Sequence, residues 1–362
     1  MLNEAVILAA DAPRILTPVG GRPFIDHLVW NVRRHGVRRV VFVVGRAGEQ
    51  VEAHVGDGAA LGIEPGYVRG PEAMGTVAAA QLALPEIAAG RFLLLDGEKL
   101  FDLNYLDLAL LADETGADVA RALHSADDGG AYVVRLAALA SLPDGGGPLV
   151  PPAARGSVVD RSYEGFFLDI GVPECLEESH AAIPVWRRKP AVFFDRDGVI
   201  NEDVGFAHTP EEFRFLPGAP EAVKLVNDAG LLAFVVTNQT GIGRGYYTED
   251  DFAAFTAWVA ERLAEKGAHV DATYFCPHHP TEALGPYLRT CECRKPAPGM
   301  LLRAMAEWEV DVEASVFIGD RPSDAEAARR AGVASVTYVG GDLRDLVRDV
   351  LHNTAKAYPT EP

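Results

Sequence analysis

Two carboxylates stand two residues apart in the segment Asp195-Arg-Asp197-Gly, directly after the apolar run 191–194. In such a turn, one carboxylate can attack phosphorus as a nucleophile while the second protonates the departing oxygen. Taken alone, the same spacing also suits a solvated turn or part of a calcium-binding loop, which is the more ordinary interpretation. Phosphoryl transfer is therefore a hypothesis that requires further residues.

A second apolar run, 232–236, is followed by a hydroxyl and two amides, at Thr237, Asn238 and Gln239. These groups can donate hydrogen bonds to phosphate oxygens. Later in the chain, the segment Cys-Arg-Lys-Pro supplies Lys295, which can neutralise the charge that spreads over a phosphoryl group. A helix cap and a solvated lysine are the ordinary alternatives for these residues.

An acidic pair follows a third apolar run. Asp320 and Asp324 come after residues 315–319 and are suited to hold a divalent cation, although an acidic turn is also a common helix start. Each of these segments has an ordinary interpretation when it is taken alone. Their joint occurrence, each after an apolar run, favours one common site.

Three of the four cysteines lie between residues 276 and 293, beside His278 and His279. Three thiolates and one imidazole make a closed tetrahedral zinc site, which implies a structural metal. The spacing leaves open which histidine is the fourth ligand, and a metal-free loop with incidental cysteines is the alternative. A zinc ion here would order the segment that presents Arg294 and Lys295.

The elements that must position these residues alternate between apolar runs and amphipathic stretches, which predicts an α/β fold with mostly parallel sheets flanked by helices. A helix is expected over 23–35. Strands are expected at 5–9, 40–44 and 92–95 in the first half, and at 191–194, 232–237, 272–275, 315–318 and 335–339 in the second.

The domain boundary is predicted at residues 183–190, where two prolines and three cations suit a short exposed connector. We therefore expect one domain over 1–184 and a second over 190–355 that contains the zinc loop. The stretch 142–152, rich in glycine and proline, is expected to be a flexible surface loop of the first domain.

Composition limits the class of protein. With 362 residues and 48% hydrophobic residues, the chain can bury two cores. Its formal charge of -19, without a long basic run, argues against nucleic acid as a partner. The N-terminus lacks the pattern of a signal peptide, and no apolar run approaches the roughly 20 residues of a membrane span. A cytoplasmic address is expected.

The strand-end segments resemble the haloacid dehalogenase superfamily over about residues 190–350. The resemblance implies that Asp195 is the nucleophile and that Asp197 is the acid that later activates water. It further implies that Thr237 and Lys295 hold the phosphoryl group.

The same resemblance implies a catalytic Mg²⁺. Asp195, the main-chain carbonyl of Asp197 and Asp320 would be its ligands. Asp324 would either bind the cation through water or orient Lys295.

The sequences Asp-Arg-Asp-Gly-Val-Ile-Asn, Cys-Pro-His-His-Pro and Cys-x-Cys-Arg-Lys-Pro narrow the resemblance to D-glycero-D-manno-heptose 1,7-bisphosphate phosphatases and the similar histidinol phosphatases. Within that group the first histidine of the pair is the zinc ligand, so the resemblance implies the set Cys276, His278, Cys291 and Cys293. It also implies substrate contacts at Asn238, Gln239, Arg244, Arg294 and Arg321, among which Arg294 is expected to grip the phosphate that is not cleaved.

The first half is similar to sugar-phosphate nucleotidyltransferases, through Ala-Val-Ile-Leu-Ala-Ala at 5–10 and Thr-Pro-Val-Gly-Gly-Arg-Pro-Phe at 17–24. It differs from them at the positions that bind the nucleotide phosphates and the metal ion. The segment 10–16 has no glycine to cradle nucleotide phosphates, and Glu98 stands where the family has a metal-binding aspartate. Asp169 is retained. We therefore expect the fold without nucleotidyl transfer, as a binding, regulatory or homo-oligomerisation module.

The leading hypothesis is hydrolysis of the 7-phosphate of a heptose 1,7-bisphosphate through an aspartyl phosphate. The nucleotidyltransferase-like first half favours a sugar substrate by analogy. Histidinol-phosphate phosphatase, a bifunctional phosphatase and sugar-1-phosphate nucleotidyltransferase, and a scaffold that has lost both activities are the alternatives.

Overall fold

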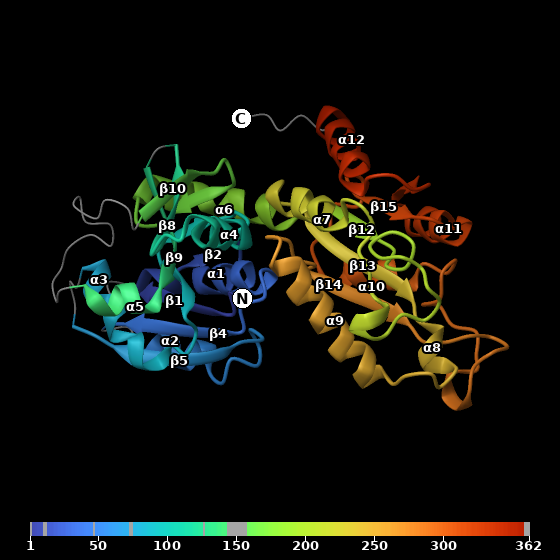
Figure 1. The fold of residues 1–362 in the computed structure, drawn as a ribbon. Helices are drawn as coiled ribbons and strands as arrows, with labels where there is room; N and C mark the ends of the chain where they lie inside the picture. Colours follow the sequence, from blue (N-terminus) through green and yellow to red (C-terminus); the bar gives the residue numbers. More distant parts are fainter. Residues whose placement is uncertain are drawn as a thin grey trace. The chain divides into compact units, whose positions relative to one another are not determined.

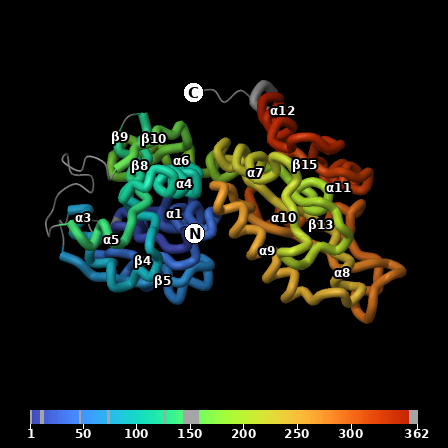
Figure 2. The backbone as a smooth tube through the Cα atoms, viewed as in Figure 1, coloured from blue at the N-terminus to red at the C-terminus, as the bar shows by residue number. Residues whose placement is uncertain are grey.

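The computed structural model describes residues 2–9, 13–45, 48–71, 75–125, 127–142 and 158–357. The chain divides into two compact units, Met1–Trp186 and Arg187–Pro362 (Figure 1), and the backbone path through each can be followed in Figure 2. Both units are α/β with mostly parallel sheets, which confirms the predicted fold class. Across the described ranges, no helix combines the length and the apolar character needed to cross a membrane.

The first unit contains a seven-stranded sheet in the order β10-β8-β9-β6-β1-β4-β5. Its neighbours pair in parallel except where β9 meets β6 and β8. Two further pairs, β2 with β3 and β7 with β11, form separate two-stranded sheets. The strands of the unit are β1 (Glu4–Ala9), β2 (Pro18–Val19), β3 (Arg22–Pro23), β4 (Arg39–Val44), β5 (Glu64–Arg69), β6 (Arg91–Asp96), β7 (Lys99–Phe101), β8 (Val119–His124), β9 (Asp127–Arg135), β10 (Val158–Ser162) and β11 (Phe167–Asp169).

The helices of this unit are α1 (Phe24–Arg34), α2 (Gly48–Val55), α3 (Thr76–Leu82), α4 (Tyr105–Thr115), α5 (Leu136–Ser141) and α6 (Pro173–Arg187), with 3-10 turns η1 (Pro13–Leu16) and η2 (Leu84–Glu86). Side chains of α3 and α5 share one apolar core with the sheet. The local signals are clear in α4, whose cap residue Asn104 accepts hydrogen bonds from two main-chain N–H groups and whose end is marked by Gly116 at φ +67°.

The second unit is built on a five-stranded parallel sheet in the order β14-β13-β12-β15-β16. Its strands are β12 (Ala191–Phe194), β13 (Leu232–Asn238), β14 (Ala272–Cys276), β15 (Val316–Gly319) and β16 (Ala334–Thr337). Its helices are α7 (Ala219–Asp228), α8 (Thr240–Gly243), α9 (Glu249–Ala264), α10 (Gly299–Glu307), α11 (Pro322–Ala331) and α12 (Leu343–Ala357), with 3-10 turns η3 (Pro210–Glu212) and η4 (Gly285–Tyr287).

Both faces of this sheet are covered, so its strands are apolar almost throughout. Alternate residues of β12 point into two different cores. Val192 and Phe194 pack with α7 and α12, whereas Ala191 and Phe193 pack with α10 and α11. The chain leaves β12 for β13 on one side and reaches β15 on the other, which makes the carboxyl end of β12 the switch point of the sheet.

The division between the two units falls within the expected connector at 183–190, but this segment is largely helical and only partly exposed. Helix α6 continues to Arg187 through this segment, and Ile183, Trp186 and Lys189 are buried. The Trp186 indole donates a hydrogen bond of 2.9 Å to Asp102. Tertiary partners therefore override the connector signal of the prolines and charges. Of the expected loop at 142–152, residues 143–152 lie outside the described residues.

Candidate active site

The chemistry-bearing residues of the second unit follow neighbouring strands. Asp195 comes directly after β12, Thr237 lies near the end of β13, and Asp320 follows β15. Because β13 and β15 both pair in parallel with β12, these ends meet at one edge of the sheet. The fold thus brings together three segments that are distant in sequence.

The ammonium group of Lys295 lies between two carboxylates, those of Asp195 and Asp324. Its buried Nζ lies 2.8 Å from Asp195 Oδ1 and 2.9 Å from Asp324 Oδ1, and it donates a hydrogen bond of 2.9 Å to the Val236 carbonyl. The Asn238 side chain forms two hydrogen bonds with the main chain of Lys295. Its Oδ1 accepts from the N–H at 3.1 Å, and its Nδ2 donates to the carbonyl at 3.3 Å. Asp324 and Asn238 thus both contact Lys295, and whether Asp324 orients the lysine or binds a cation through water stays a prediction.

Asp195 is nearly enclosed by protein. Burial is the main cause that raises its pKa to about 6, while Lys295 acts to lower the pKa and the Asp324 carboxylate to raise it. The main-chain N–H of Arg196 donates a 2.7 Å hydrogen bond to Oδ1, and the N–H of Asp195 itself is satisfied by the Ile318 carbonyl. The carboxylate is thus held in place, but its ion pair and hydrogen bond offset only part of the free-energy cost of burying its charge.

Carboxylate oxygens of Asp195, Asp320 and Asp324 lie within 4.8 Å of one another, a spacing that suits a divalent cation. Burial raises the pKa of Asp320, and its buried Oδ1 has no hydrogen-bond partner in the described part of the chain. Gly198 leaves room beside it, because a Cβ there would lie 2.4 Å from Asp320 Oδ2. An all-oxygen set with an orphaned acceptor fits Mg²⁺.

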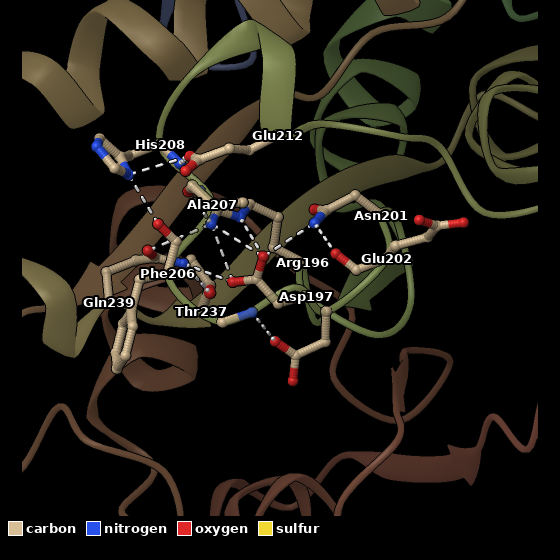
Figure 3. Close-up of polar contacts among 12 residues, drawn as sticks. Arg196, Asp197, Asn201, Glu202, Phe206, Ala207, His208, Glu212, Thr237 and Gln239 are labelled. Atoms are coloured by element: carbon tan, nitrogen blue, oxygen red, sulfur yellow. Dashed lines mark hydrogen bonds and ion pairs between the residues drawn. The ribbon is translucent and has the colours of Figure 1, made fainter.

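The Asp197 carboxylate is engaged by three neighbouring side chains, which Figure 3 shows converging on it. Oδ1 accepts hydrogen bonds from Arg196 and from Asn201 Nδ2 (3.0 Å), and Oδ2 accepts from Arg196 and from Gln239 Nε2 (2.8 Å). Arg196 and Asn201 were not singled out from the sequence. Their positions inside the Asp-Arg-Asp-Gly-Val-Ile-Asn motif were the available signal.

Thr237 and Gln239 belong to the same network. Both are buried, and Gln239 Nε2 donates to Thr237 Oγ1 at 2.8 Å. The Oε1 atom of Gln239 accepts a 2.6 Å hydrogen bond from Tyr247, whose pKa burial raises to about 12, so the phenol stays a donor at neutral pH. Gln239 is therefore occupied within the protein, and its expected substrate contact stays a prediction.

The three expected substrate arginines each have a protein partner. Arg244 forms an ion pair with Glu282, Arg294 donates to the His278 carbonyl at 3.3 Å, and Arg321 pairs with Asp203 at 2.6 Å. Their roles toward a substrate stay predictions.

A pocket of about 790 Å³ adjoins Asp320. Gly198 and Tyr338 contribute to its wall together with the carboxylates of Glu202 and Asp203. Three of its ten lining residues are acidic, and one of them, Asp203, is paired with Arg321.

The cysteine and histidine residues also converge. Sulfur–sulfur distances among Cys276, Cys291 and Cys293 are 3.0 to 3.5 Å, and His278 Nδ1 lies 3.3 Å from the Cys293 sulfur. The ring of His279 instead accepts from the N–H groups of the following turn. The geometry therefore selects His278 over His279, and the S₃N donor set fits a tetrahedral zinc ion.

In the first unit, Glu98 and Asp169, the acidic residues noted in the sequence, both border Gly171. Glu98 Oε2 lies 3.4 Å from Arg14 Nη1, and Asp169 Oδ1 accepts a hydrogen bond from the Gly171 N–H. Among the described residues, groups with the spacing of metal ligands occur in the second unit. Residues 10–12 of the shortened loop lie outside the described residues.

Comparison with known proteins covers both units. The HAD-hydrolase-like family matches residues 292–357, and the nucleotidyl transferase family matches residues 8–131. A D-glycero-beta-D-manno-heptose-1,7-bisphosphate 7-phosphatase of Rhodopseudomonas palustris is 42% identical over 170 residues, which are 47% of this chain and 94% of that protein. A D-glycero-alpha-D-manno-heptose-1,7-bisphosphate 7-phosphatase of Burkholderia mallei is 45% identical over 149 residues, which are 41% of this chain and 79% of that protein.

Among solved structures, the D,D-heptose 1,7-bisphosphate phosphatase of B. bronchiseptica, determined with magnesium and phosphate, is 29% identical to this chain. The match covers 45% of this chain and 99% of that protein, with a TM-score of 0.40.

Proposed function

We propose that this chain, which belongs to the family of the D-glycero-D-manno-heptose-1,7-bisphosphate 7-phosphatases, removes the 7-phosphate of that bisphosphate through an aspartyl-phosphate intermediate. The observation that carries the proposal is the contact of Lys295 with both Asp195 and Asp324 at the switch point of the sheet. A buried carboxylate beside a fixed cation is what a phosphoryl-accepting nucleophile requires.

In the first step, an oxygen of Asp195 attacks phosphorus, and Asp197 protonates the sugar oxygen as its bond to phosphorus breaks. In the second step, Asp197 takes a proton from water, the water attacks the phosphoaspartate, and inorganic phosphate leaves. Thr237 and Lys295 bind the phosphoryl oxygens throughout. Mg²⁺, held by Asp195, the Asp197 carbonyl and Asp320, would offset the negative charge on those oxygens.

The sulfur and nitrogen cluster would hold a structural Zn²⁺ through Cys276, His278, Cys291 and Cys293. Four protein ligands leave no position for substrate, so the ion would stabilise the loop that leads into Arg294 and Lys295. Burial raises the pKa of the Cys276 thiol, so zinc binding would release protons and weaken as the pH falls.

We further propose a cytoplasmic enzyme whose partner is a small phosphorylated sugar, with boundaries near 1–184 and 190–355. The first domain would serve binding, regulation or homo-oligomerisation, without nucleotidyl transfer. Its replacement of the expected aspartate by Glu98, already contacted by Arg14, supports this assignment.

A phosphate-release assay tests the function. The purified protein is offered the α and β anomers of heptose 1,7-bisphosphate, and histidinol phosphate as the alternative substrate. We expect the bisphosphate to be preferred, with a loss of about 1,000-fold or more in Asp195→Asn and no loss in the exposed control Asp250→Asn. Faster hydrolysis of histidinol phosphate would overturn the substrate, and an active Asp195→Asn would overturn the mechanism.

A further inference from the structure

We propose that Arg196 is a positioning residue that fixes the Asp197 carboxylate and connects it to the turn formed by Phe206, Ala207 and His208. The inference rests on the proposed function, because Asp197 matters as an acid and base only if phosphoryl transfer occurs.

Arg196 makes most of the contacts to Asp197. Its Nε and Nη2 donate to Oδ1 at 3.1 and 2.9 Å, and Nη2 also donates to Oδ2 at 3.0 Å. These are three of the five hydrogen bonds described for this carboxylate, the others coming from Asn201 and Gln239. A planar guanidinium that contacts both oxygens sets the direction of the carboxylate as well as its place.

The guanidinium is itself held from several directions. Its carbon lies 5.5 and 5.4 Å from the ring centroids of Phe252 and Phe255, and the side chain is only 5% exposed. Nη2 also donates to the Ala207 carbonyl at 2.9 Å and to Gln239 Oε1 at 3.3 Å. Two aromatic faces and two further acceptors leave the arginine little freedom, so it can act as a rigid support.

Asp197 is more exposed than Arg196, as expected if the arginine supports a carboxylate that must reach the substrate. Asp197 keeps 20% of its side-chain surface exposed, whereas Arg196 is enclosed. A buried ion pair is a poor source of stability, because desolvation offsets much of the attraction. The arrangement is better explained as one that presents a directed carboxylate to a reacting group.

The Ala207 carbonyl connects this support to a strained turn (Figure 3). Phe206 has φ +65°, which is unusual for a bulky residue, and its carbonyl accepts a 2.8 Å hydrogen bond from His208 Nδ1. The His208 ring stacks on Tyr247 at 4.6 Å, the same tyrosine that donates to Gln239. The Ala207 carbonyl and the His208 ring therefore both lead to partners of Asp197, the first to Arg196 and the second, through Tyr247, to Gln239.

The test uses the leaving group of the substrate. Departure of a sugar alkoxide needs a proton from Asp197, whereas acetate and 4-nitrophenolate leave without one. The value of kcat/KM reports the steps up to departure of the leaving group. A misdirected Asp197 should therefore slow the heptose bisphosphate much more than acetyl phosphate or 4-nitrophenyl phosphate.

We expect Arg196→Met to lose about 30- to 100-fold in kcat/KM on the bisphosphate and less than about fivefold on the two activated esters. Arg196→Lys keeps a cation between the aromatic rings but not the planar fork, so it should show the same selectivity to a smaller extent. It also serves if Arg196→Met does not fold. Arg214→Met is the control, since Arg214 is exposed and bonds to main-chain carbonyls of Glu211 and Phe213.

Equal losses on all three substrates, or no loss in a folded variant, would overturn the positioning role. The two proposals fail separately. If the parent protein releases phosphate from none of the substrates, the proposed function is wrong. If the parent hydrolyses them but the Arg196 variants show no leaving-group selectivity, only the role of Arg196 is wrong.

Discussion

At the scale of single residues, the site concentrates charge that the fold does not fully compensate. Lys295 contacts Asp195 and Asp324, yet burial still raises the pKa of Asp195 to about 6. Asp320 has a raised pKa and a buried oxygen without a partner in the described residues. Charge that the fold leaves uncompensated lowers stability, as is expected at a reactive site.

This imbalance predicts that Asp195→Asn stabilises the metal-free protein above neutral pH. In the unfolded chain, an aspartate titrates near about 3.9, below its value of about 6 in the fold. The folded state therefore disfavours the ionised form of Asp195. The resulting loss of folding stability is absent below about pH 4, grows between pH 4 and 6, and is complete above about pH 6. Thermal unfolding in chelator should show the variant melting higher than the parent at pH 8 and equal to it at pH 4.

Calorimetry over pH 4 to 8 gives the measurement, with Asp250→Asn as the control for loss of an exposed charge. A variant that melts below the parent at pH 8 would contradict the expectation. That result would mean that the ion pair with Lys295 outweighs the cost of burying the carboxylate.

At the scale of elements, the loop between β14 and α10 carries both the sulfur cluster and Lys295. Cys276 ends β14 and is buried in the core beneath α10, while Cys293 stands two residues before the lysine. If a zinc ion joins these points, the position of Lys295 depends on the metal.

Cys291→Ser should therefore lower the zinc content from about one ion per chain to well below that, and lower the melting temperature. Turnover should fall with it, because the segment before Lys295 loses one of its anchors. Elemental analysis gives the zinc content, and Cys175→Ser, at a cysteine outside the cluster, is the matched control. Unchanged zinc in Cys291→Ser would rule out this ligand set.

At the scale of the whole molecule, each unit has an apolar core of its own, and all proposed catalytic and zinc ligands lie in the second. The proposed mechanism therefore places no catalytic residue or metal ligand in the first unit.

We expect the fragment 187–362 to fold alone and to hydrolyse the bisphosphate within about threefold of the full chain. Circular dichroism checks folding, and kcat/KM on both proteins checks activity. A folded fragment with activity more than about tenfold lower would show that the first unit contributes to the reaction.

Features that depend on neighbouring residues in the chain could be predicted from the sequence. The apolar runs at 191–194 and 232–237 are strands β12 and β13 of a parallel sheet, because burial on both faces demands continuous apolar residues. The Asp-x-Asp and cysteine motifs marked the candidate site, since their members stand close together in the chain.

The partners of these side chains became known from the folded structure. It carried α6 through the expected connector, selected His278 over His279, and placed Asn238 on Lys295 instead of leaving it free. It also brought Arg196 between two phenylalanine rings and the Ala207 carbonyl. Hydrogen bonds and burial depend on strand order and on residues far away in sequence, so local spacing does not contain them.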